Sequence, residues 1–146
     1  MALILAAGCG SDGGVADPVD ELEPGSIVGT IDGRGWSTAN AFVIYANGRL
    51  VASGTGSQNL AFGFGVTAQS TGTYATGGNG NASAILSGAG TDRWEAAVPG
   101  GSGTLTITSF SSDEVAGTFS FNMVRTGGAG APDMRTITDG RFRVRY

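Results

Sequence analysis

The chain has 146 residues, a formal net charge of −4, a single cysteine and no histidine. The absence of histidine removes the usual general base and the commonest metal ligand, and one cysteine allows neither a thiolate zinc site nor an intrachain disulfide. All eight basic residues are arginines, which excludes a P-loop and Schiff-base chemistry. The composition therefore predicts a protein that is not an enzyme and that uses no catalytic residue, metal or cofactor.

The first nine residues resemble the end of a bacterial lipoprotein signal. An apolar run, residues 2–8, leads through small Ala7 and Gly8 to Cys9, whose thiol would take lipid. No basic residue precedes the run, so we interpret residues 1–8 as a truncated signal peptide. This predicts attachment to the bacterial cell envelope, at the outer membrane, through a lipid on Cys9. The alternative is an N-terminal strand that buries a free thiol.

Residues 9–25 are predicted to form an acidic, flexible tether. The stretch is built largely from Gly, Ser, Asp, Glu and Pro and contains no basic residue. Its five acidic residues carry a charge of −5. Because the whole chain has a net charge of −4, residues 26–146 have a net charge of +1. A nearly neutral domain without a basic stripe argues against a nucleic-acid partner. Residues 26–146 are expected to fold as one domain.

Apolar and polar residues alternate with a period of two over most of this domain, which is typical of strands with one wet side. The alternation places Phe119, Phe121 and Met123 on one face, and Leu60, Phe62, Phe64 and Val66 on another. The predicted strands lie near residues 27–32, 38–46, 49–53, 60–67, 72–75, 82–86, 93–97, 103–110, 115–125 and 134–146. About ten short strands predict an all-β fold, either an antiparallel β-sandwich or a closed β-barrel.

Three dipeptides have the composition of tight hairpin turns: Asp32-Gly33, Asn47-Gly48 and Asp139-Gly140. Each supplies residues that tolerate a positive φ. The last of them falls inside the final predicted strand, which is expected to bend there.

One predicted strand carries almost no side chain on one face, where Ala61, Gly63 and Gly65 alternate with large residues. Alternate glycines permit strong curvature or the close approach of another surface. The pattern therefore indicates either a barrel corner or a glycine-floored groove in which a ligand lies flat.

Both ends of the domain resemble a family of uncharacterised bacterial lipoprotein domains. The similarity rests on residues 29–36, Gly-Thr-Ile-Asp-Gly-Arg-Gly-Trp, and on residues 117–121 and 138–146 near the C-terminus. The resemblance implies an all-β, lipid-anchored envelope protein without an assigned activity, and it offers no catalytic residue to transfer.

Two groups of residues are candidates for ligand binding. Trp36 and Trp94 would stack against sugar rings if they are exposed, although burial in the core is the commoner fate of tryptophan. Arg141, Arg143 and Arg145 share one face of a strand and would grip a carboxylate or phosphate, unless they only protect a solvated sheet edge. The partner suggested by these residues is a glycan or an envelope protein.

Two other functions remain open. A lipocalin-like barrel would hold a small apolar ligand in a deep internal cavity, although Arg34 stands where the Gly-x-Trp signature of lipocalins has glycine. A glycan hydrolase would need paired carboxylates, for which Asp92 with Glu95, or Asp113 with Glu114, are the candidates. The loop at residues 76–81 lacks the aspartate of a calcium-binding repeat, so no metal site is expected.

Overall fold

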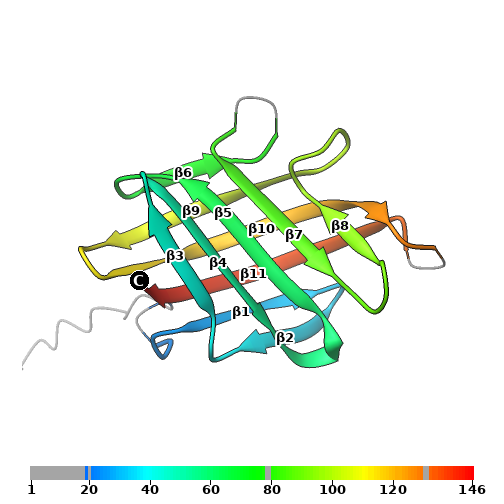
Figure 1. The fold of residues 1–146 in the computed structure, drawn as a ribbon, viewed down its shortest axis with the longest axis horizontal. Helices are drawn as coiled ribbons and strands as arrows, with labels where there is room; N and C mark the ends of the chain where they lie inside the picture. The colour runs from blue at the N-terminus through cyan, green and yellow to red at the C-terminus, as the bar shows by residue number, and fades with distance from the viewer. Residues whose placement is uncertain (1–18, 20, 78–79, 130–131) are drawn as a thin grey trace, which may run out of the picture.

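The computed structural model describes residues 19, 21–77, 80–129 and 132–146, and the chain is all-β within these residues, as predicted (Figure 1). The elements are β1 (Ser26–Ile31), β2 (Arg34–Thr38), β3 (Phe42–Ala46), β4 (Arg49–Thr55), the 3-10 turn η1 (Ser57–Asn59), β5 (Ala61–Thr67), β6 (Gly72–Ala75), β7 (Ala82–Ser87), β8 (Arg93–Glu95), β9 (Ser102–Phe110), β10 (Glu114–Gly127) and β11 (Met134–Arg145).

These strands form a single antiparallel sheet in the order β2-β1-β11-β10-β8-β7-β5-β4-β3, while β9 pairs with β10 and β6 pairs with β9. Figure 1 shows that β3, β4, β5 and β7 form a front layer that crosses over β1, β9, β10 and β11. The sheet is therefore strongly curled into an open half-barrel. It does not close clearly into either of the two architectures predicted from the sequence.

The core lies between the crossing layers and is rich in phenylalanine. Phe62 of β5 stacks on Phe119 of β10 with ring centroids 5.1 Å apart, and Phe64 of β5 meets Phe142 of β11 at 4.8 Å. Each of these four rings is at most 5% exposed. Burial of such a side chain contributes about 1.5–3 kcal/mol to folding. The inward faces predicted from the alternation are thus confirmed.

Two of the three predicted hairpin turns are confirmed. Asp32-Gly33 joins β1 to β2, and Asn47-Gly48 joins β3 to β4, with positive φ at all four residues. The wide tolerance of glycine and of short polar side chains for this conformation explains both turns.

The third predicted turn, Asp139-Gly140, is instead a bulge inside β11. Phe121 pairs with Ile137 but Phe119 pairs with Gly140, so β11 has one extra residue there, and Asp139 takes a φ of 52°. Because β11 is paired on both sides, with β1 and β10, the chain cannot reverse at this point. The predicted bend is present, but the hairpin prediction was wrong.

The predicted strand at residues 38–46 is in fact the end of one strand and the whole of another. Thr38 closes β2, which pairs with β1, whereas β3 begins at Phe42 and pairs with β4. Between them the Ala41 N–H donates to the Gly25 carbonyl at 2.9 Å. The chain therefore passes from one end of the sheet to the other at residues 39–41.

Most of the predicted N-terminal features, including the signal at residues 1–8 and Cys9, lie outside the described residues. The described end of the predicted tether packs on the domain: Val19 is 1% exposed, and the Gly25 N–H donates to the Arg143 carbonyl at 2.7 Å. None of the residues that the structure describes belongs to a helix long and apolar enough to cross a membrane.

Candidate functional site

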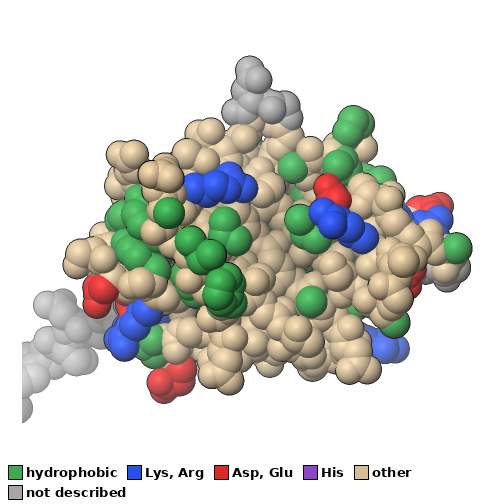
Figure 2. Space-filling view, viewed as in Figure 1, with side chains coloured by type: hydrophobic (Ala, Val, Ile, Leu, Met, Phe, Trp, Pro, Cys, Tyr) green, Lys and Arg blue, Asp and Glu red, His purple; other side chains and the backbone are tan. Residues whose placement is uncertain are grey.

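A groove of about 600 Å³ runs over the outer face of β3, β4, β5 and β7. Its floor contains Gly63 and Gly65 of β5, and its lining also includes Phe42, Arg49, Val51, Ser53, Ser83 and Ile85. Figure 2 looks onto this face and shows hydrophobic side chains gathered left of centre, over β3 and β4, beside a broad stretch of backbone and uncharged polar side chains.

The floor exists because β5 alternates between large inward residues and glycine. Side chains of neighbouring residues point to opposite faces of a strand, so Phe62 and Phe64 fill the core while Gly63 and Gly65 face outward. A Cβ atom on Gly63 would lie 2.9 Å from the Cβ of Ser53. Both glycines line the groove, and they also belong to a strongly curled sheet, so each of the two interpretations describes part of what the structure shows.

Arg49 lies across one end of this floor. Its Nη1 donates to Thr67 Oγ1 at 3.4 Å and its Nη2 donates to Ser83 Oγ at 3.2 Å. Among the described residues, five other arginines form ion pairs and Arg49 has no carboxylate within 4.0 Å. A guanidinium has five N–H donors, so most of this donor capacity faces neutral groups or solvent.

The walls of the groove mix apolar and hydroxyl groups. Phe42 and Ile85 are 64% and 37% exposed, which is unusual for side chains of this size. Ser53 lies in the same row of paired residues as these two side chains, and Ser83 lies on β7 opposite Gly65. The groove therefore offers a ligand apolar contacts and hydrogen-bonding groups side by side, with the positive charge of Arg49 at one end.

The two tryptophans lie in the interior and not on this surface. Trp36 is 3% exposed and its Nε1 donates to the Leu60 carbonyl at 3.0 Å. Trp94 is 1% exposed, donates to the Pro132 carbonyl at 2.8 Å, and lies 4.7 Å from the guanidinium carbon of Arg135. Neither ring is open to a sugar in this structure, which corresponds to the burial alternative.

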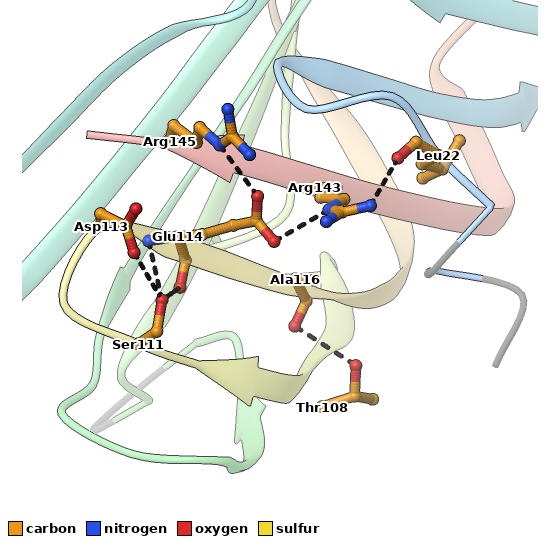
Figure 3. Close-up of polar contacts among 8 residues, drawn as sticks. All are labelled: Leu22, Thr108, Ser111, Asp113, Glu114, Ala116, Arg143 and Arg145. Atoms are coloured by element: carbon orange, nitrogen blue, oxygen red, sulfur yellow. Dashed lines mark hydrogen bonds and ion pairs between the residues drawn. The ribbon is translucent and has the colours of Figure 1, made fainter.

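Arg143 and Arg145 do grip a carboxylate, but it is one of the protein's own. Figure 3 shows both side chains reaching from β11 to Glu114 at the start of β10. Arg143 Nε donates to Glu114 Oε1 at 2.8 Å, and Arg145 Nε donates to Glu114 Oε2 at 3.1 Å. Arg143 also donates to the Leu22 carbonyl at 3.2 Å. These two arginines therefore tie the N-terminal segment and the start of β10 to the end of β11.

Arg141 lies apart from that cluster. It borders a second hollow, of about 500 Å³, on the outer side of β9, β10 and β11, together with Asp139, Thr106 and Thr118. The structure does not bring the three predicted arginines to one ligand, because two of them are engaged by Glu114.

The candidate carboxylate pairs are held by neighbouring polar groups. Glu95 accepts from Arg93 at 2.6 Å and from Thr126 at 3.2 Å. Asp113 accepts from the Ser111 hydroxyl at 3.0 Å, in the turn before Glu114. Within the described part of the chain, no three His, Cys, Asp or Glu residues are grouped so that they could hold a metal ion.

Sequence reasoning found the glycine floor but missed Arg49 and Phe42. The segment Phe42-Val43-Ile44-Tyr45-Ala46 is apolar at every position, so its pattern does not show which side chains face outward. Arg49 directly follows a hairpin turn, where an arginine carries no distinctive signal. These residues come to one groove through the pairing of β3 with β4, which sets Phe42 against Ser53, and of β4 with β5, which sets Val51 against Gly65.

The comparisons with known proteins identify a family but no activity. No curated protein and no solved structure matches the chain. Residues 23–143 match the model of a domain of unknown function, DUF6252, and because this match spans most of the 146 residues, the chain belongs to that family.

Proposed function

We propose that this protein is a non-enzymatic binding module of the bacterial cell envelope, and that it takes a carboxylate-bearing saccharide in the outer groove. The observation that carries the proposal is the position of Arg49 across Gly65, at the end of a glycine floor flanked by apolar and hydroxyl side chains.

The charge of Arg49 favours an anionic ligand. A guanidinium recognises a carboxylate through two parallel hydrogen bonds, and the carboxylates of the described residues are all beyond ion-pair distance from this one. Its present acceptors, Thr67 Oγ1 and Ser83 Oγ, are neutral hydroxyls. A carboxylate would therefore gain a charge-assisted bond without displacing an internal ion pair.

The rest of the groove favours a sugar as the body of the ligand. A pyranose ring has an apolar face and a rim of hydroxyl groups, and it needs a flat surface with hydrogen-bonding groups beside it. Gly63 provides the flat floor, Phe42 provides an exposed aromatic side chain, and Ser53 and Ser83 provide hydroxyl partners. Binding sites generally combine apolar lining with a few placed polar groups in this way.

The location in the envelope rests on the sequence. The lipobox-like run before Cys9 and the acidic stretch after it would hold the domain near a membrane surface on a spacer. The direct test is fatty-acid labelling of the chain expressed with its upstream in-frame DNA in a bacterial host. Labelling that is lost in Cys9→Ala supports the anchor, and absence of labelling in both chains removes it.

The core is less favourable to the lipocalin-like alternative. The space that an internal ligand would need contains the rings of Phe62, Phe64, Phe119, Phe121 and Phe142, with neighbouring centroids 4.8–6.4 Å apart. The floor of the 600 Å³ groove contains Gly63 and Gly65, which face the opposite side of β5 from these rings.

The binding proposal is tested by calorimetric titration of the chain carrying Cys9→Ser with trigalacturonic acid and with a neutral trisaccharide. We expect the acidic sugar to bind, and we expect its affinity to fall at least tenfold, about 1.4 kcal/mol, in Arg49→Gln. Arg34→Gln is the matched control, because Arg34 is an exposed arginine on β2 that does not line the groove. Equal loss in both variants would indicate an unspecific charge effect and would contradict the site.

A further inference from the structure

The two ends of the curled sheet are protected very differently. At one end, η1 covers β2: Gln58 Nε2 donates to the Gly35 carbonyl at 3.0 Å, and Ser57 Oγ approaches the same oxygen at 3.4 Å. At the other end, β3 pairs only with β4 among the described strands. The outward side chains of β3, Phe42 and Ile44, are 64% and 48% exposed.

The free edge of β3 presents a defined set of backbone groups. The two-residue turn makes Ala46 and Arg49 a hydrogen-bonded pair, and hydrogen-bonded and non-bonded pairs then alternate along the hairpin. The N–H and C=O groups of Val43 and Tyr45 consequently point away from β4. Within the described chain no other backbone group or side chain bonds to these four groups. They are available to another strand.

The same edge lacks the usual defences against strand pairing. Natural edge strands carry charges, prolines or bulges that discourage contact with another chain. Residues 35–48 contain no charged residue and no proline, and β3 pairs with β4 without a register shift. A second copy of this edge would therefore meet it without like-charge repulsion.

We propose that the protein forms a two-fold symmetric dimer in which β3 pairs antiparallel with β3 of a second copy. In the register that uses all four free groups, Val43 lies opposite Tyr45 of the second copy, and Tyr45 lies opposite its Val43. Ile44 then faces Ile44 of the second copy at a non-bonded position, and Phe42 faces Ala46. The interface is isologous, as closed dimers require.

Neighbouring registers satisfy fewer groups. Pairing Val43 with Val43 of the second copy would set Tyr45 opposite Ala41, whose N–H is already bound to the Gly25 carbonyl. The side chain of Tyr45 points inward, where its ring lies 5.7 Å from Phe110 and 4.7 Å from Tyr146, so the outer seam is formed by Phe42 and Ile44. This dimer does not depend on what the groove binds.

Sedimentation velocity of the full chain carrying Cys9→Ser tests the association. We expect a dimer for this chain and a monomer for Ile44→Lys, because a lysine pair would meet at the two-fold axis. Ile85→Lys is the matched control: Ile85 is an isoleucine on the same face, 37% exposed, in β7 and away from the edge, and this variant should remain dimeric. A monomeric parent chain, or a dimer that persists in Ile44→Lys, would overturn the proposal.

Disulfide trapping in the same background tests the register and does not require the lysine variant to fold. Opposed non-bonded residues in an antiparallel pair have Cα atoms about 4.5 Å apart, within the range that a disulfide spans. Oxidised Ile44→Cys should therefore form a covalent dimer in high yield, and Phe42→Cys, which faces Ala46, should form little. The reverse yields, or no cross-link at position 44, would show that β3 is not paired in this way.

Discussion

Arg49 lies over Gly65 so closely that a Cβ atom added to the glycine would come 2.5 Å from Arg49 Nη2 and 3.2 Å from Ser83 Oγ. The glycine therefore determines where the guanidinium rests, and with it the positive end of the groove.

Replacement of Gly65 by alanine should weaken ligand binding more than it weakens the fold. The methyl group pushes the flexible end of Arg49 away from the floor, so we expect at least a tenfold loss of affinity for trigalacturonic acid. The free energy of unfolding should change by less than about 1 kcal/mol, since alanine suits a strand interior no less than glycine does. Calorimetric titration and urea unfolding measure the two quantities. Gly35→Ala, at a site with no atom within 4 Å of the added Cβ, should alter neither.

Truncation of two phenylalanines on opposite sides of the sheet should change the free energy of unfolding by very different amounts. Phe62 is 1% exposed and its ring contacts Trp36, Phe64, Phe119 and Phe121, so Phe62→Ala should destabilise the fold by about 3–5 kcal/mol. Phe42 is 64% exposed within one copy of the chain, so Phe42→Ala should stay within about 0.5 kcal/mol when unfolding is measured at a protein concentration low enough to separate the proposed β3–β3 dimer. Chemical denaturation gives both values. A large loss in Phe42→Ala would mean that its side chain is buried against something in the folded protein.

The Glu114 cluster should stabilise the fold and leave ligand binding unchanged. Glu114→Gln removes the anion shared by Arg143 and Arg145, and we expect a loss of about 1 kcal/mol that shrinks at high salt. Arg145→Gln should cost less than Arg143→Gln, because Arg145 is 61% exposed while Arg143 is 27% exposed and also binds the Leu22 carbonyl. Denaturation at low and high ionic strength checks the order. A gain of affinity for the acidic saccharide in Glu114→Gln, which frees Arg143 and Arg145, would place the ligand here and not in the outer groove.

Tyr146 should ionise later than an ordinary tyrosine. Burial raises the pKa of its phenol above 10.0, with smaller contributions from Tyr45 and Asp113, and the hydroxyl donates to the Ser111 carbonyl at 2.6 Å. Since the folded-state pKa is the higher one, this contribution to stability is complete below pH 10.0 and is lost as the pH rises through the raised value. Ultraviolet absorbance titration should show a late transition that disappears in Tyr146→Phe. Persistence of the late transition in Tyr146→Phe, with an earlier one lost instead, would refute the assignment.

Local patterns were sufficient to predict most of the strands and their inward faces, because both depend on neighbours in the sequence, but they merged the end of β2 with β3. Phe62, Phe119 and Phe142 followed directly from the period of two. The pairing of strands that are distant in the chain could not be predicted from such local patterns. Whether Asp139-Gly140 reverses the chain or bulges depends on β1 and β10 lying on either side of β11, and one short motif does not contain that information.

In the candidate site, too, local features were predictable from the sequence and contacts between distant residues were not. The glycine floor was visible as a pattern within one strand, but Arg49 acquires its role only through the pairing of β4 with β5. Arg143 and Arg145 were candidates for holding a ligand carboxylate, and the sequence did not reveal that Glu114 of the same chain pairs with both. Partners distant in the chain decide which charged groups remain available to a ligand.

The most direct test of the binding site is a backbone amide chemical-shift titration of the full chain carrying Cys9→Ser. Addition of trigalacturonic acid should shift the amide signals of Gly63 and Gly65, and the shifts should be strongly reduced in Arg49→Gln and absent with a neutral trisaccharide. Shifts confined to Gly140 and Arg141, beside the second hollow, or no shift with the acidic sugar, would contradict the assignment of the outer groove as the ligand site.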